Sequence, residues 1–211
     1  AVYYVPPVTN PPVSASRYTV YAETVNAGEA RHPDALSWQA WENNSTAVIA
    51  LDQTVSDAAE GSKVLTVTPR PLSWGWGAFA ALPARNEDLT AFQASGTLNF
   101  SIRTTYPGSL EVGFFTGRAA DGTAYDVYLP LAPGQYGYQN DGQWHQVSIP
   151  LSAIIARGAM AFGMTDPTRS RLQMTQVANS FVIADRYGVT GKSQNAGHVN
   201  PIQLDGIFWA R

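Results

Sequence analysis

The sequence contains no cysteine in 211 residues, which excludes disulfide bonds, zinc thiolate sites and a cysteine nucleophile. Charged residues are also scarce, at 14% against about 25% in an average globular protein. Only two of the 13 basic residues are lysines, Lys63 and Lys192, and no basic run is present, which argues against a nucleic-acid-binding surface. No stretch approaches the roughly 18–20 continuous apolar residues of a transmembrane helix.

Aromatic and turn-forming residues are abundant instead. The chain has 6 Trp, 10 Tyr and 8 Phe, together with 18 Gly and 14 Pro, and its hydrophobic content of 45% excludes a disordered chain. This composition is typical of β-rich extracellular domains. Aromatic rings can stack on the apolar C–H faces of sugars, and they can equally fill the core of a β-sandwich. Composition alone leaves both interpretations open.

The chain is predicted to begin with a proline-rich segment that is followed by one all-β domain. Residues 1–16 contain two Pro-Pro pairs and no strand or helix period, which indicates either a linker or a terminal arm packed on its own domain. Residues 17–211 contain about ten short strand-like runs and two short helical candidates, Asn86–Ala94 and Leu151–Arg157. Short strands separated by turns predict a β-sandwich of two antiparallel sheets.

Several segments occur in an order that resembles one known group of domains. They are EGSKVLTVT at 60–68, SWGWGAF at 73–79, DLTAF and GTLNFSIRT within 88–104, DGQWHQVSIPLSAI at 141–154 and IQLDGIFW at 202–209. Their order resembles the galactose-binding-like β-jelly rolls that serve as carbohydrate-binding modules on bacterial polysaccharide hydrolases. The nearest resemblance is to β-glucan-binding modules of the family-eleven type and to the C-terminal domain of certain exo-β-glucosidases. It covers residues 17–211, and it leaves the long segment Gly158–Asn200 unexplained.

The resemblance implies a jelly-roll fold and a non-catalytic module that binds a neutral polysaccharide, with a β-glucan as the preferred ligand. It also implies a secreted or periplasmic monomer with a covalently attached glycoside hydrolase domain. Such tethering raises the local concentration of the enzyme on its polymer.

One candidate binding surface is the outward face of the strands. Alternation sends Leu98, Phe100, Ile102, Leu110, Val112 and Phe114 inward. The same alternation sends outward a mixture of aromatic rings and planar hydrogen-bonding groups, which glycan recognition requires: Arg103, Glu111, Phe115, Asp126, Tyr128, Gln146 and Ser148. The alternative is that the second sheet or Gly158–Asn200 covers this face and buries Phe115 and Tyr128.

Further aromatic candidates lie outside these strands. Trp74 and Trp76 are two residues apart on an extended segment, so their side chains are expected to point the same way and to form a sugar-stacking platform. Tyr136 and Tyr138 have the same spacing in a predicted loop, where tyrosines often bind ligands. The alternative for each pair is ordinary packing.

The resemblance also implies a structural calcium ion. The matching positions are Glu23 near the end of the first strand and Asp205 on the last strand, with Glu60 and carbonyl groups at 60–63 completing an oxygen shell. The alternative is that Asp205 caps a turn and that Glu23 is a solvated strand end.

Enzymatic function is the second hypothesis. The three histidines, His32, His145 and His198, have no metal-binding spacing, and the sequence contains no nucleophile elbow or phosphate-binding loop. A polysaccharide lyase or glycoside hydrolase on the same fold would use Glu111 and Asp126 or His145. We therefore expect a binding module without catalytic residues, and we keep as alternatives the enzyme and a structural or adhesion domain that binds protein.

Overall fold

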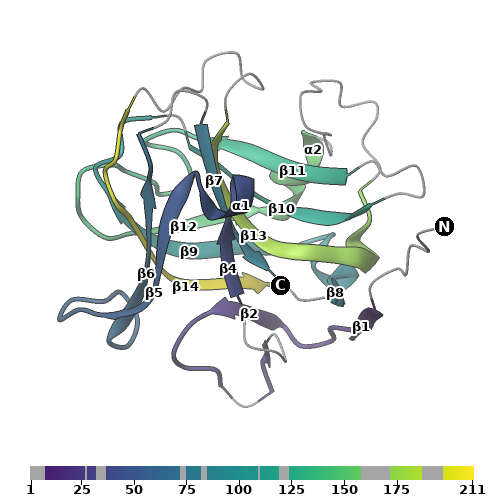
Figure 1. Cartoon of the computed structure of the whole chain (residues 1–211). Helices are drawn as coiled ribbons and strands as arrows, with labels where there is room; N and C mark the ends of the chain where they lie inside the picture. Colours follow the sequence, from purple (N-terminus) through teal and green to yellow (C-terminus); the bar gives the residue numbers. More distant parts are fainter. Residues whose placement is uncertain are drawn as a thin grey trace.

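The computed structural model describes residues 8–26, 28–31, 37–71, 75–81, 85–108, 110–118, 124–157, 172–186 and 197–211. Within these ranges, two sheets of seven strands each lie face to face, as predicted for a β-sandwich (Figure 1). Most strand pairs are antiparallel, but the pairs β1–β8 and β2–β3 at the sheet edges are parallel. No helix in the described residues is long and apolar enough to span a membrane.

We name each sheet after a central strand. The β13 sheet has the order β1-β8-β13-β10-β11, with β7 also paired to β13 and β4 paired to β7. Its strands are β1 (Val8–Pro12), β4 (Ser37–Ala40), β7 (Gly75–Ala81), β8 (Arg85–Asp88), β10 (Leu110–Arg118), β11 (Ala124–Leu131) and β13 (Val177–Arg186).

The β14 sheet has the order β12-β9-β14-β2-β3, with β6 also paired to β14 and β5 paired to β6. Its strands are β2 (Arg17–Tyr21), β3 (Ala30–Arg31), β5 (Ala47–Thr54), β6 (Lys63–Pro69), β9 (Thr97–Thr104), β12 (His145–Pro150) and β14 (Ile202–Ala210).

Helical structure is confined to short pieces in the described residues: α1 (Trp41–Asn44), η1 (Thr90–Phe92), α2 (Leu151–Ala156) and η3 (Met174–Gln176). The helix predicted at Leu151–Arg157 is present as α2. The helix predicted at Asn86–Ala94 is wrong, because this segment starts as strand β8 and only its second half turns into η1. Asn86 and Glu87 are buried in the strand, where β8 pairs with β1 and with β13.

The sandwich core follows from the period-two alternation of the strands. The six residues predicted to point inward from β9 and β10 are all at most 1% exposed and belong to one core cluster. Trp209 belongs to this cluster, and its ring centroid lies 4.9 Å from that of Phe114 and 6.1 Å from that of Phe92. Its indole Nε1–H donates a 2.8 Å hydrogen bond to the Ser180 carbonyl, so the one polar group of the ring is satisfied inside the core.

The described part of the proline-rich segment packs on the domain as an arm. Strand β1 pairs with β8, and Asn10 bridges Glu87 and Arg85 on that strand. The Arg211 side chain also donates hydrogen bonds to the carbonyl groups of Ser14 and Ala15. Residues 8–16 therefore contact the domain through strand pairing and side-chain hydrogen bonds.

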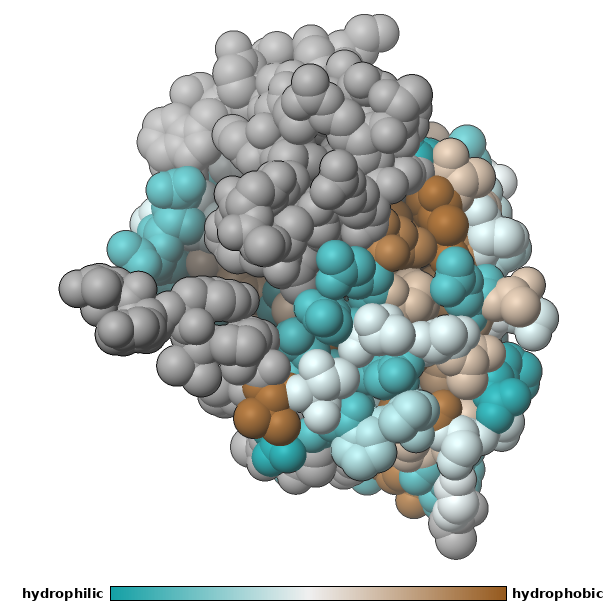
Figure 2. Space-filling model, turned by 90° about the vertical axis from the view of Figure 1, so that its right-hand side faces the viewer, coloured by the Kyte–Doolittle hydropathy of each residue, from teal (hydrophilic) through white to brown (hydrophobic). Residues whose placement is uncertain are grey.

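Figure 2 shows the side of the molecule that is turned away to the right in Figure 1. Among its coloured residues, hydrophobic side chains form small patches that polar side chains separate. Val8, Val48, Leu51, Tyr136 and Val199 are the exposed large hydrophobic residues of the described chain. Scattered apolar residues of this kind are normal on a soluble surface.

We predict that Trp209→Ala lowers the free energy of unfolding by about 3–5 kcal/mol, because it removes a large ring from a core that cannot fully collapse. Urea denaturation followed by circular dichroism measures this loss. The matched control is Phe208→Ala on the opposite face of the same strand, where the partly buried ring lies 3.6 Å from the Arg17 guanidinium carbon. That change should cost only about 1 kcal/mol, and equal losses for the two variants would contradict this description of the core.

Candidate functional site

The residues predicted to share one outward face lie on two opposite faces of the sandwich. Arg103 on β9 and Gln146 on β12 belong to the β14 sheet, whereas Glu111 and Phe115 on β10 and Tyr128 on β11 belong to the β13 sheet. The prediction of a single binding face is therefore wrong. Alternation along a strand distinguishes inward from outward side chains, but it does not say to which sheet a strand belongs.

Arg103 is held by neighbours on the outer face of the β14 sheet. Its guanidinium forms a two-point ion pair with Asp57, and its Nε–H donates to Gln203 Oε1 at 2.6 Å. The guanidinium carbon also lies 4.7 Å from the Trp144 ring centroid. Arg103 holds the pKa of Asp57 below its usual value through this hydrogen bond and its charge. These contacts tie the β5–β6 connection to the sheet, and they leave Arg103 little freedom to bind a ligand.

The outer face of the β13 sheet carries a second hydrophobic cluster, separate from the sandwich core. Tyr128, Val182 and Ala184 are buried in it, and Trp41, Phe79 and Phe115 pack against them while remaining partly exposed. Neighbouring ring centroids are 6.4 Å apart for Trp41 and Tyr128, 5.7 Å for Tyr128 and Phe115, and 6.1 Å for Phe115 and Phe79. The four rings thus form one contiguous aromatic cluster with three partly exposed rings, which we call the aromatic face.

Strand register explains how the rings meet. Phe79, Val182, Gly113 and Tyr128 are paired in turn across β7, β13, β10 and β11. Neighbouring strands lie about 4.8 Å apart, so rings on β7 and β10 reach 6.1 Å only by leaning over β13. Ala184 on β13 pairs with Gly77 on β7, so both strands carry small residues where the Trp41 indole lies.

The aromatic face requires a glycine at position 77. A Cβ atom at this position would overlap the indole ring of Trp41. The indole therefore lies directly on the backbone of β7. Gly77 does not have a positive φ, so what the position requires is the absence of a side chain.

The rings of the cluster differ in exposure and orientation, and the buried ring supports the partly exposed ones. Tyr128 is 1% exposed and stands at 88° to Trp41 and at 76° to Phe115. It therefore braces the two partly exposed rings edge to face. The prediction that Tyr128 itself is open to a ligand is wrong, and Phe115 is only partly exposed. Glu111, on the same face, is also 1% exposed, which contradicts its predicted exposure. Asp126 pairs with Phe115 through the backbone, and its side chain lies outside the described structure.

The predicted tryptophan platform is not formed by Trp76. Its side chain is completely buried on the inner face of β7, where its Nε1–H donates to the Tyr106 hydroxyl at 3.0 Å. That hydroxyl in turn donates to Asp185 at 2.7 Å, and burial together with this acceptor raises the pKa of Tyr106. The alternative of core packing is thus correct for Trp76. Trp74 lies outside the described residues.

The two loop tyrosines, Tyr136 and Tyr138, differ in their exposure. Tyr138 is 1% exposed, and burial raises its pKa to about 12, so its prediction as a surface ligand-binding residue is wrong. Tyr136 is 38% exposed and has a φ of 51°. Its carbonyl accepts a hydrogen bond from the Ser148 backbone N–H on β12, which places it beside the β14 sheet and away from the aromatic face.

The three acidic residues predicted to bind calcium do come together. All six of their carboxylate oxygens accept hydrogen bonds: Glu23 from Ser62 and Lys63, Glu60 from the backbone of Glu23 and Thr24, and Asp205 from the backbone of Glu60 and Gly206. Burial raises the pKa of the Asp205 carboxyl, and the negative charges of Glu60 and Glu23 add to this effect.

This cluster has the oxygen-only, negatively charged donor set that calcium takes. Among the described residues, however, no group of three or more His, Cys, Asp or Glu side chains is arranged around a common metal position. The calcium site stays a prediction, and an ion would compete with the N–H groups that now hold the carboxylates.

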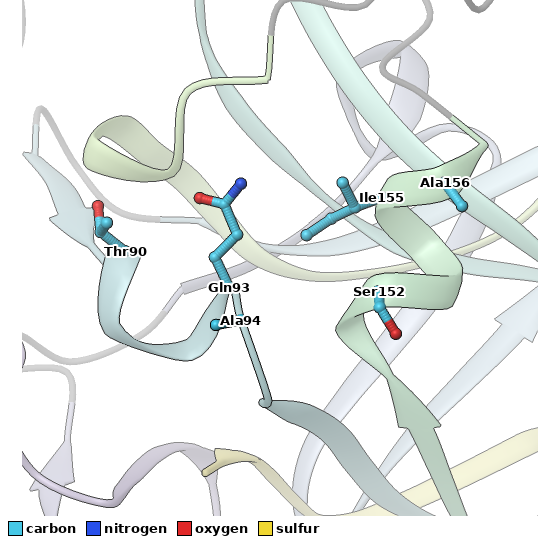
Figure 3. A pocket seen from close by; sticks show the side chains of 6 residues that line it. All are labelled: Thr90, Gln93, Ala94, Ser152, Ile155 and Ala156. Atoms are coloured by element: carbon cyan, nitrogen blue, oxygen red, sulfur yellow. The ribbon is translucent and has the colours of Figure 1, made fainter.

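A groove lies between η1 and α2, away from the aromatic face. It encloses about 540 Å³ and is lined by Thr90, Gln93, Ala94, Ser152, Ile155 and Ala156. Figure 3 shows Ile155 pointing across the gap toward the segment that carries Gln93. No aromatic ring lines the groove, so it lacks the stacking surface that sugar binding needs.

Two members of the aromatic face were missed at the sequence level. Phe79 could have been found, because alternation in GWGAFAA sends Trp76, Ala78 and Ala80 inward and leaves Gly77 and Phe79 outward. Trp41 could not be found in this way. It follows the end of β4 in a turn, where the period-two rule no longer applies.

The described fold is a β-sandwich that carries an aromatic cluster on the outer face of one sheet. A family model described as carbohydrate binding domain 30 matches residues 24–188. The chain belongs to this family, which confirms the resemblance to jelly-roll carbohydrate-binding modules.

Solved structures agree with this assignment at the level of the fold. A family 30 carbohydrate-binding module has 15% identity and a TM-score of 0.58, over 92% of this chain and 98% of that chain. The family 30 module of a Clostridium thermocellum cellulosomal cellulase has 17% identity and a TM-score of 0.56, over 94% of both chains.

A Clostridium thermocellum family 11 module, solved with a β-1,3-1,4-mixed-linked tetrasaccharide, is also similar. It has 13% identity and a TM-score of 0.51, over 84% of this chain and 91% of that chain. No curated protein matches the chain.

We predict that Gly77→Ala displaces the Trp41 ring from the sheet and weakens polysaccharide binding without unfolding the domain. The φ of Gly77 is not positive, and the three atoms nearest to the new methyl group all belong to the indole of Trp41. A double-mutant cycle with Trp41→Ala measures the coupling. Gly77→Ala should have little further effect on affinity or on stability once the indole is absent. Additive effects of the two changes would show that Gly77 does not act through Trp41.

Proposed function

We propose that the protein is a non-catalytic carbohydrate-binding module that binds a neutral polysaccharide, preferably a β-glucan, on the aromatic face. The observation that carries this proposal is the cluster of Trp41, Phe79 and Phe115, which remain partly exposed on the outside of the β13 sheet. A large ring that is held rigidly and only partly buried offers a stacking surface for a pyranose at little cost in side-chain entropy.

The choice of a neutral β-glucan has two supports. The chain contains few basic residues, whereas an acidic polysaccharide would favour a positive surface. The similar family 11 module was solved with a mixed-linked β-glucan tetrasaccharide. Secretion, a monomeric state and attachment to a glycoside hydrolase belong to the same proposal, because a module of this kind acts by keeping an enzyme on its insoluble substrate.

We predict that Trp41→Ala weakens binding to soluble β-glucan by about tenfold or more, since loss of one aromatic anchor typically costs about 2 kcal/mol. Affinity electrophoresis against mixed-linkage β-glucan, laminarin, xylan, galactomannan and alginate measures the effect. The matched control is Trp144→Ala, which removes a partly buried tryptophan from the opposite face and should leave binding unchanged. If Trp144→Ala loses binding and Trp41→Ala does not, the site lies on the β14 sheet and the proposal is contradicted.

The same gels test the alternative of catalysis. A binding module is retarded by the polymer in the gel but does not cleave it. After incubation with each polymer, the amounts of reducing ends and unsaturated sugars should therefore stay at background. Release of product that survives Trp41→Ala would favour an enzyme and contradict the proposal.

We further propose that calcium binds at Glu23, Glu60 and Asp205 and stabilises the fold. Calcium should raise Tm by about 2–4 °C for each 1 kcal/mol of stabilisation by binding in a chain of this size. EDTA should reverse this rise. Asp205→Asn should abolish the calcium-dependent shift, whereas Asp57→Asn, which alters a carboxylate paired with Arg103, should retain it. A Tm that responds neither to calcium nor to EDTA would contradict the metal site.

A further inference from the structure

The turn that follows Trp41 has a backbone conformation that is rare for its residues. Glu42, Asn43 and Asn44 have φ values of 56°, 54° and 62°, and none of them is glycine. Left-handed backbone is unfavourable for L-residues because Cβ approaches the next carbonyl, although asparagine tolerates it better than most. Three such residues in succession persist only where their surroundings hold them, and conformations of this kind gather at binding sites.

Side-chain hydrogen bonds hold the turn at both ends. The Ala40 backbone N–H donates to Asn44 Oδ1 at 2.7 Å, and the Thr46 hydroxyl donates to the Trp41 carbonyl at 3.2 Å. The turn joins β4 of the β13 sheet to β5 of the β14 sheet. Its path therefore fixes the point from which the Trp41 side chain starts toward Gly77 and Tyr128.

Connection of the two sheets does not by itself explain the residues. Glycine would adopt the left-handed backbone without strain. The chain instead has Glu, Asn and Asn, and all three are exposed and directly follow Trp41 in the sequence. A carboxylate accepts hydrogen bonds from two hydroxyl groups, and an amide donates and accepts. These are the groups that recognise the vicinal hydroxyls of a sugar.

We propose that the turn Glu42–Asn44 is the specificity-determining edge of the glycan site, an inference that rests on the proposed function. The strained backbone positions Trp41, and the Glu42 carboxylate and the Asn43 amide bind hydroxyl groups of the sugar unit beside the one that stacks on the indole. The partner chemistry is a neutral glycan with vicinal hydroxyl groups.

Asn43→Gly separates this role from a structural one, because the two effects have opposite signs. Glycine relieves the strained backbone, so Tm should stay equal or rise, while loss of the amide should weaken β-glucan binding by about five- to tenfold. Glu42→Ala should weaken binding to a similar extent. Calorimetric titration with a soluble mixed-linkage β-glucan gives the affinities, and thermal denaturation gives Tm. The matched control is Asp52→Gly, an exposed position on β5 with a φ of 56°, which should bind with unchanged affinity.

Asn44 tests the positioning step. Asn44→Ala removes the acceptor for the Ala40 N–H and should weaken binding, whereas Asn44→Asp keeps an acceptor oxygen and should restore it. Wild-type affinity in Asn43→Gly and Glu42→Ala, together with loss of binding in Trp41→Ala, would overturn this inference and leave the proposed function intact. Wild-type affinity in Trp41→Ala would overturn both.

Discussion

Face-to-face packing of two sheets is the constraint on which the rest of the structure depends. Every second side chain of each strand packs in the shared core, and the side chains between them point away from it. The core takes Trp76, Trp209 and the aliphatic residues of β9, β10 and β13. The side chains left outside are polar on the β14 sheet around Arg103, but on the β13 sheet they form a second apolar cluster. This second cluster exposes hydrophobic side chains that the sandwich core does not use, and it is the physical basis on which we propose the binding site on this sheet.

The aromatic face depends on small residues as much as on its rings. Gly77 admits the indole of Trp41, and the residue paired with Gly77 on β13 is the small Ala184. Tyr128 is buried beneath and holds two of the rings at steep angles. The rings are thereby fixed before any ligand arrives, so a glycan would not have to order them. The turn at Glu42–Asn44, which we propose as the edge of the site, is held by hydrogen bonds from Ala40 and Thr46 in a strained backbone conformation.

Much of the fold could be predicted from the sequence, because period-two alternation is a local property. The strands around TLNFSIRT and LEVGFFT and their inward residues were correctly placed. The site could not be predicted in the same way, because it depends on which sheet each strand joins. Arg103 and Phe115 have the same outward character in the sequence, yet they lie on opposite faces of the molecule. The burial of individual aromatic side chains could not be predicted from the sequence either. Trp76, Tyr128 and Tyr138 have the composition of sugar-binding residues, and only tertiary packing shows that they are enclosed. Trp41 was missed because it follows a strand end.

The central claim is that a polysaccharide binds the β13 sheet at Trp41, and the indole N–H signals of the tryptophans test it most directly. The chain has 6 tryptophans, of which Trp76 and Trp209 donate their N–H groups inside the core and Trp144 lies on the opposite face. Titration of 15N-labelled protein with a mixed-linkage β-glucan oligosaccharide should shift the Trp41 signal, while the signals of Trp76, Trp209 and Trp144 stay in place. A Trp144 signal that moves while the Trp41 signal does not would contradict the account.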